Sequence, residues 1–198
     1  MDSEREIELF ERLVERQVVH AGTYMTFAHD TVLDPEGKNH SRDVVLHPGA
    51  VTVVAILPDR RVLLVRQYRH AAGEVLLELP AGTLDRQPDD SLEEPLPAAQ
   101  RELTEETGHR AATWRELARF FTAPGFASEL MTLYLATGGT PDPDHVGPDP
   151  DERLALVALP FDDALGQAQH GEIRDAKTIV GLYMTDALAR AGEIEELA

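Results

Sequence analysis

The segment QRELTEETGH, residues 100–109, restricts the fold more than any other part of the chain. It places Glu102, Glu105 and Glu106 within five positions and follows them with Gly108. Residues three and four apart are neighbours on a helix, so these carboxylates share one face, where each like-charge pair costs about 0.2–0.5 kcal/mol. Gly108 predicts the C-terminal end of this helix, and acids in a last turn oppose the helix dipole. The pattern therefore predicts a cation that the sequence itself does not supply.

A hard divalent cation, Mg²⁺ or Mn²⁺, matches this acidic segment because both ions take carboxylate, carbonyl and water oxygens. Glu102 and Glu106 lie one helical turn apart, so both can reach one ion. The alternative is a solvated acidic face, which is the common reason for a run of charge. The specific patterning of RELTEETG favours the metal site.

The composition narrows the choice of partners and compartment. The chain has 36 acidic residues against 18 Lys and Arg, a net charge of −18, which repels nucleic acid and anionic membranes. It has no cysteine, which excludes disulfides and zinc-thiolate sites. The longest apolar run, residues 50–57, is too short to span a bilayer, and the charged residues 1–16 do not form a signal peptide. We therefore expect a soluble cytoplasmic protein with no nucleic-acid or membrane partner.

Hydrophobic periodicity predicts an α+β fold. A short amphipathic helix is expected over residues 5–16, followed by β-rich stretches up to residue 57 with a hairpin turn at 34–40. Further strands are expected at 61–70, 74–82, 112–125, 130–138 and 154–159, and helices at 95–107, 161–170 and 176–191. We predict one main domain, residues 48–198, with an N-terminal helix and β-rich arm, residues 1–47.

Several common nucleotide and metal motifs are missing from the sequence. There is no Walker loop, no dinucleotide-binding glycine fingerprint and no His-Glu-x-x-His helix. Residues 142–153 begin like an EF-hand calcium loop but have Val146 and Arg153 at positions that need oxygen ligands. These classes of site are therefore discarded.

Residues 81–109 resemble the signature of the Nudix hydrolases: Gly, five residues, Glu, seven residues, then Arg-Glu-apolar-x-Glu-Glu-x-Gly-apolar. The matching residues are Glu93, Arg101, Glu102, Leu103, Glu105, Glu106 and Gly108. Gly82 also matches, but ten residues separate it from Glu93, which indicates a five-residue insertion in the loop. His109 stands where an apolar residue is usual. The insertion leaves the helix register unchanged.

The resemblance extends to the ADP-ribose pyrophosphatase branch of that family. It covers HPGAVTVVAIL, VLLVRQYRHAAGEVLLELPAG, FTAPGFASE and DAKTIVGLYM, and Pro124 stands sixteen residues after Gly108, as is characteristic of the branch. The resemblance implies an α/β/α sandwich around a mixed sheet and a homodimer in which the N-terminal arm crosses to the partner. It also implies hydrolysis of ADP-ribose to AMP and ribose 5-phosphate.

The resemblance assigns roles within the signature. Glu102 and Glu106 are the implied metal ligands, joined by the backbone carbonyl of Ala81. Glu105 is a third acid that holds another metal or its water. Arg101 orients the glutamates by ion pairing. Residues with implied structural roles are Gly82, Glu93, Gly108 and Pro124.

The general base is expected on the loop before a late strand, where Glu152 matches best. Its neighbours Asp149 and Asp151 could substitute, and a plain solvated loop is the alternative.

Substrate contacts are implied at three further positions. Arg69 lies where the branch presents a phosphate-binding arginine, with Arg66 and Gln67 as weaker candidates. Glu78 is either a substrate or metal-shell contact or a buried structural acid. Glu129 is expected to help close the pocket.

Two rival functions remain open from the sequence. One is hydrolysis of another nucleoside diphosphate sugar, such as GDP-mannose, and the other is a Nudix fold that only binds a nucleotide. Trp114, the only tryptophan, could stack on adenine, but its strand position favours core packing.

Overall fold

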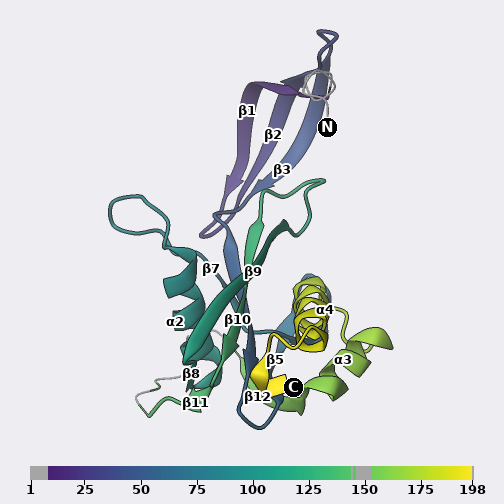
Figure 1. Cartoon of the computed structure of the whole chain (residues 1–198). Helices are drawn as coiled ribbons and strands as arrows, with labels where there is room; N and C mark the ends of the chain where they lie inside the picture. The colour runs from purple at the N-terminus through teal and green to yellow at the C-terminus, as the bar shows by residue number, and fades with distance from the viewer. Residues whose placement is uncertain (1–8, 144, 146–152, 198) are drawn as a thin grey trace. The chain divides into compact units, whose positions relative to one another are not determined.

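The computed structural model describes residues 9–143, 145 and 153–197 (Figure 1). The chain divides into two compact units, one of residues 1–49 with 121–130 and one of residues 50–120 with 131–198. None of the helices among the described residues is both long and apolar enough to cross a membrane.

The first unit is built on a three-stranded antiparallel sheet in the order β1-β2-β3. Its strands are β1 Arg12–Ala21, β2 Thr26–Leu33 and β3 Asn39–Leu46. Asp34 forms the β2–β3 turn by accepting a hydrogen bond from the N–H of Lys38 at 2.8 Å, and Gly37 has φ 82°, which glycine adopts without steric cost. The hairpin turn predicted at 34–40 is confirmed.

The helix predicted over residues 5–16 is wrong for residues 12–16, which belong to β1; residues 5–8 lie outside the described residues. Leu13 and Val14 fit a helical spacing, but pairing with β2 overrides it. The Arg16 guanidinium donates to both carboxylate oxygens of Asp30 on β2, at 2.8 and 2.6 Å. This cross-strand pair is a long-range contact that local periodicity does not reveal.

The second unit contains a seven-stranded mixed sheet with the order β12-β5-β4-β10-β9, to which β6 adds on β5 and β7 on β4. The strands are β4 Ala50–Ile56, β5 Arg61–Arg69, β6 Glu74–Glu78, β7 Ala81–Thr83, β9 Thr113–Phe121, β10 Leu130–Thr137 and β12 Leu154–Pro160. β4 runs parallel to β10 and antiparallel to β5 and β7. A separate two-stranded ladder joins β8 His109–Arg110 to β11 Thr140–Pro141.

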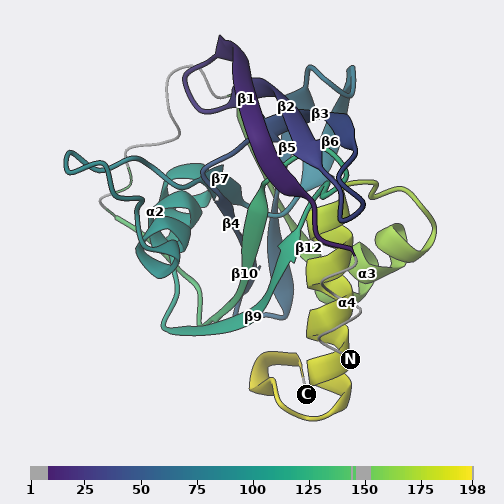
Figure 2. The same cartoon turned by 90° about the horizontal axis from the view of Figure 1, so that it is seen from above.

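Helices cover both faces of this sheet (Figure 2). They are α2 Pro95–Thr107, α3 Phe161–Gln169 and α4 Ala176–Arg190, with a short 3₁₀ turn at Glu195–Leu197. All seven residues of β4 are buried, and they alternate between the two faces as strand geometry requires. Val54 and Ile56 pack with α3 and α4, while Val51 and Val53 pack with α2. The predicted α/β/α sandwich around a mixed sheet is confirmed.

Candidate active site

Helix α2 has the limits that its sequence predicts. Pro95 and Pro97 lie in its first turn, where no N–H is needed. It ends at Gly108, which has φ 66° and donates its N–H to the carbonyl of Thr104 at 2.8 Å. This register buries Leu103 against the sheet and leaves the metal-ligand candidates at the edge of the core.

The carboxylates of Glu102 and Glu106 lie against the backbone of β7. Each of the two residues is only 7% exposed. The N–H of Ala81 donates to Oε2 of Glu106 at 3.0 Å. A Cβ added to Gly82 would fall 1.8 Å from Oε1 of Glu102, so a larger residue here would force that carboxylate to move. The predicted signature glycine therefore has a steric cause.

Arg101 gathers three of the acids around one guanidinium. Its Nη1 donates to Glu102 at 2.8 Å and Glu105 at 2.9 Å, and its Nη2 donates to Glu93 at 2.8 Å. Burial alone would lower the pKa of Arg101, but the hydrogen bond with Glu93 and the charge of Glu102 outweigh it and raise the pKa. Arg101 therefore supplies part of the positive charge that the acidic segment was predicted to need, and it does so from within the chain.

The loop that carries the five-residue insertion closes on itself before α2 begins. The N–H of Gln87 donates to the carbonyl of Ser91 at 2.8 Å, and the N–H of Glu93 donates to the carbonyl of Asp85 at 2.8 Å. Asp90 takes the left-handed backbone conformation, with φ 68°. Because the extra residues form a closed turn, they do not shift the register of the helix.

The residues around Glu102 and Glu106 fit a hard divalent cation. Among the described residues, no group of three or more His, Asp or Glu side chains is placed to hold a metal ion. Mg²⁺ commonly binds one or two carboxylates and keeps several waters or substrate phosphate oxygens. Two buried carboxylates beside the Ala81 backbone meet that need. The candidate bases Asp149, Asp151 and Glu152 lie outside the described residues.

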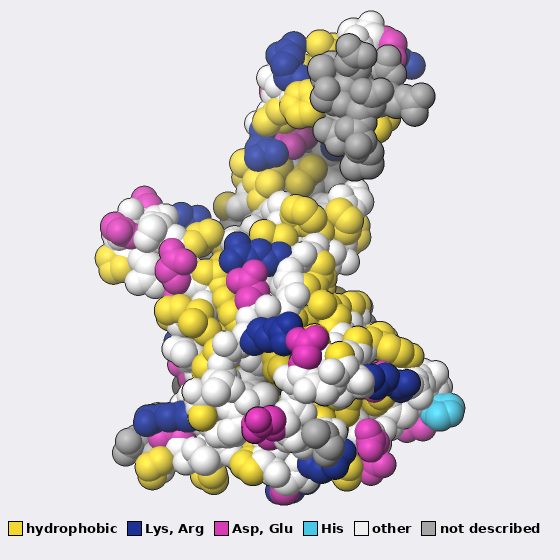
Figure 3. All heavy atoms as spheres, in the orientation of Figure 1, with side chains coloured by type: hydrophobic (Ala, Val, Ile, Leu, Met, Phe, Trp, Pro, Cys, Tyr) yellow, Lys and Arg dark blue, Asp and Glu magenta, His cyan; other side chains and the backbone are white. Residues whose placement is uncertain are grey.

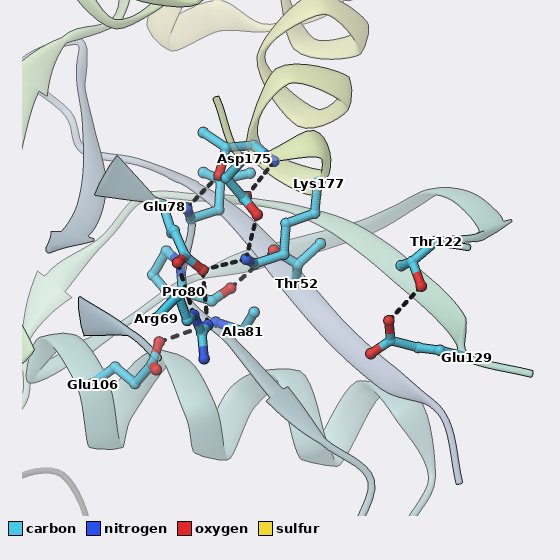
Figure 4. A network of polar contacts seen from close by, with 12 residues as sticks. Thr52, Arg69, Glu78, Pro80, Ala81, Glu106, Thr122, Glu129, Asp175 and Lys177 are labelled. Carbon is cyan, nitrogen blue, oxygen red and sulfur yellow. Dashed lines mark hydrogen bonds and ion pairs between the residues drawn. The ribbon is translucent and has the colours of Figure 1, made fainter. Parts of the chain in front are cut away.

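Arg69, the last residue of β5, is held by Glu78 (Figure 4). Its Nε and Nη2 donate to the two oxygens of Glu78, both at 2.8 Å. Burial would raise the pKa of Glu78, but hydrogen bonds from Arg69 and the charge of Lys177 outweigh it and lower the pKa. Glu78 is 1% exposed, so its carboxylate is buried. Figure 4 shows the Arg69 guanidinium beside Ala81 and Glu106.

Glu129 and Pro124 belong to the first unit. Glu129 accepts a hydrogen bond from the Thr122 hydroxyl and lies 3.6 Å from Nε2 of His47. The N–H of Gly49 donates to Nδ1 of the same His47 ring at 3.1 Å. His47 and Thr122 carry no local sequence signal, because they reach Glu129 only through the fold.

The remaining candidate residues from the sequence differ in burial. Arg66 is exposed, whereas Oε1 of Gln67 is buried and has no hydrogen-bond partner in the part of the chain that the structure describes. Trp114 packs edge-on against Tyr134 with ring centroids 6.2 Å apart, in agreement with the core interpretation. The sequence interpretation missed Asp175, Lys177 and Thr178 as neighbours of the site.

Comparisons with known proteins agree with this geometry. Residues 46–180 match the family model described as the NUDIX domain. The chain is 36% identical over 179 residues to the ADP-ribose pyrophosphatase of Mycobacterium tuberculosis (88% of this chain, 83% of the relative). It is 33% identical over 170 residues to the ADP-ribose pyrophosphatase of Bacillus subtilis (86% and 89%). It is 35% identical over 172 residues to the methanol dehydrogenase activator of Bacillus methanolicus (87% and 90%).

A solved structure described as an ADP compounds hydrolase superposes with a TM-score of 0.78 at 22% identity, covering 94% of this chain and 98% of the other. That likeness supports the fold. Because the family model spans more than half of the chain, the protein belongs to the Nudix family.

Proposed function

We propose that this protein hydrolyses the pyrophosphate bond of ADP-ribose, giving AMP and ribose 5-phosphate, with Mg²⁺ as the cofactor and Mn²⁺ as a substitute. The observation that carries the proposal is the packing of Glu102 and Glu106 against the backbone at Ala81 and Gly82. Two relatives that share a third of their residues with this chain are ADP-ribose pyrophosphatases, which supports the choice of substrate.

The metal-holding residues in this proposal are Glu102, Glu106 and the carbonyl of Ala81. A bound cation would neutralise charge on the phosphoryl oxygens and lower the pKa of water. Glu105 serves as the third acid. Arg101 holds the glutamate carboxylates in place through the hydrogen bonds described above, which prevents them from turning away from one another.

The substrate contact in this proposal comes from Arg69, and the base from Glu152. Nε and Nη2 of Arg69 bind Glu78, so the opposite edge of the guanidinium is turned away from that pair and can meet a phosphate oxygen. Glu152, outside the described residues, takes the proton of the attacking water.

The same proposal includes a cytoplasmic homodimer formed through the N-terminal arm. All ten residues of β1 are exposed, among them the apolar residues Leu13, Val14, Val18 and Val19. Hydrophobic side chains are visible over this unit in Figure 3. A long exposed edge strand with apolar residues is a pairing surface, which supports a second copy as its partner.

A substrate panel tests the proposed function. ADP-ribose, GDP-mannose, UDP-glucose, NADH and a diadenosine polyphosphate are incubated with the enzyme and Mg²⁺, and the products are separated. The proposal predicts AMP and ribose 5-phosphate from ADP-ribose as the fastest reaction. If GDP-mannose or another compound reacts tenfold faster, the chemistry stands and the substrate is wrong; no turnover with Mg²⁺ or Mn²⁺ would indicate a nucleotide-binding protein.

A further inference from the structure

The N-terminus of α4 carries three polar side chains that are bonded to one another inside the protein. Asp175 caps the helix: its Oδ2 accepts from the N–H of Thr178 at 3.0 Å and from the Thr178 hydroxyl at 2.6 Å. Its Oδ1 accepts from Nζ of Lys177 at 3.0 Å. Lys177 is 9% exposed, Thr178 is fully buried, and the Asp175 side chain is partly buried at 17% exposed.

This cluster reaches the end of β6, 99 residues away in the chain. Nζ of Lys177 donates to Oε2 of Glu78, the same oxygen that accepts from Nη2 of Arg69. The Thr178 hydroxyl accepts from the N–H of Leu79 at 2.8 Å. Helix α4 therefore holds both the side chain of Glu78 and the backbone that follows it.

The next two residues are fixed from other elements. The carbonyl of Pro80 accepts from the hydroxyl of Thr52 at 3.0 Å and from the N–H of Val53 at 2.9 Å, both on β4. Ala81 is bonded to Glu106 on α2, as described above. Residues 78–81 are thus held by α4, β4 and α2 in turn, and Figure 4 shows these contacts.

The network contains two cationic and two anionic side chains, so its formal charges balance. Arg69 and Lys177 are cationic, and Glu78 and Asp175 are anionic. A buried ion-pair network is often no more stabilising than apolar residues of the same volume, whereas loss of one partner leaves an uncompensated buried charge. The arrangement instead fixes where one charged group lies: Arg69, whose side chain is 42% exposed and free to turn into solvent if it is not held.

We propose that Lys177 is a positioning residue that fixes the Glu78 carboxylate, which in turn holds the Arg69 guanidinium beside Ala81 and Glu106 to receive a phosphate group of the substrate. The last step rests on the proposed function, because it assigns Arg69 to the pyrophosphate. In this proposal Lys177 does not contact the substrate, and it affects the reaction only by positioning Glu78.

The test compares Lys177→Met, Glu78→Gln and the double variant in the full-length protein. Arg190→Met, which removes an exposed ion pair with Asp186 at the other end of α4, is the matched control. Three quantities are measured: KM and kcat for ADP-ribose with Mg²⁺, the Kd for Mn²⁺ from the electron paramagnetic resonance of free Mn²⁺, and the Nε–Hε NMR signal of Arg69, assigned with Arg69→Lys.

Lys177→Met is expected to raise KM about tenfold, as for loss of a charge-assisted contact, with kcat changed less than threefold. The Mn²⁺ Kd should stay within twofold, the Arg69 Nε–Hε signal should shift or broaden, and the double variant should be no worse than Glu78→Gln alone. Arg190→Met should match the wild type.

The proposal is overturned by an unchanged Arg69 signal, by an unchanged KM, or by single-variant effects that multiply in the double variant. A parallel loss of Mn²⁺ affinity and kcat also overturns it, because it would show general damage to the fold. An inactive wild type would refute the proposed function instead, and the Arg69 signal would then decide alone whether Lys177 holds that guanidinium.

Discussion

At Gly82, a single added methyl group should disturb the candidate metal site while the fold persists. Gly82→Ala places a Cβ 1.8 Å from Oε1 and 2.0 Å from Cδ of Glu102, so that carboxylate must move. We expect Mn²⁺ affinity and kcat to fall about 10–100-fold, which is the usual effect of a substitution that disturbs the orientation of a metal ligand. Mn²⁺ titration and steady-state kinetics measure the two effects.

The control for this substitution is Gly166→Ala on α3, where an added Cβ meets nothing within 4 Å. That variant should keep full activity and gain about 0.5–1 kcal/mol of stability from helix propensity. Equal Mn²⁺ affinity in Gly82→Ala and the wild type would show that the Glu102 carboxylate is not part of the cation site.

The spatial neighbours of a residue can be predicted from the sequence for some site residues and not for others. Glu102 and Glu106 were predicted to lie together because helical spacing is local and Gly108 marks the helix end. Glu78 and Lys177 are 99 residues apart, and no local pattern encodes their contact. The sequence therefore leaves the role of Glu78 open, whereas the structure shows its partners, Arg69 and Lys177.

At the scale of elements, the pairing of β1 with β2 should depend on pH through Asp30. Its pKa is lowered chiefly by the hydrogen bonds from Arg16. A carboxyl whose folded pKa is depressed contributes stability above its unfolded pKa, about 3.9, and loses it as the pH falls through the folded value. Asp30→Asn should therefore lower the free energy of unfolding at pH 7, with the difference from wild type narrowing below about pH 4.

Urea unfolding of both proteins between about pH 3 and 7 measures this difference. Asp90→Asn is the control, because the Asp90 side chain is 91% exposed and should matter little at any pH. A difference between wild type and Asp30→Asn that stays constant with pH would mean that the Arg16–Asp30 pair does not stabilise the strand pairing.

The elements themselves were predictable wherever a short-range signal defines them. The hairpin at 34–40 and the limits of α2 follow from turn and capping residues. Strand β1 was mistaken for a helix because Leu13 and Val14 fit a helical period, and only the partner strand decides between the two. A segment whose local pattern fits two structures, as in β1, can be assigned only when its long-range partner is known.

For the whole molecule, the proposed dimer can be tested by the molar mass of the protein in solution. Light scattering on the eluted protein should give twice the chain mass of 21.8 kDa. Val14 and Val18 are 50% and 54% exposed on β1, and their joint replacement by Glu should give a monomer because like charges would meet at the strand edge.

Val75→Glu, at an equally exposed valine of the second unit, is the control for that variant and should remain dimeric. A wild-type protein that elutes as a monomer at micromolar concentration would contradict the proposed arm-mediated dimer.

The proposed function requires the carboxylates of Glu102 and Glu106, beside β7, to hold the cation that the reaction needs. The direct measurement is AMP release from ADP-ribose across a Mg²⁺ titration, for the wild type and for Glu106→Gln. We predict that release requires Mg²⁺ and falls about 100-fold or more in the variant, while thermal unfolding shows the variant to be folded. AMP release that persists in a chelator, or that is equal in Glu106→Gln and the wild type, would contradict the account.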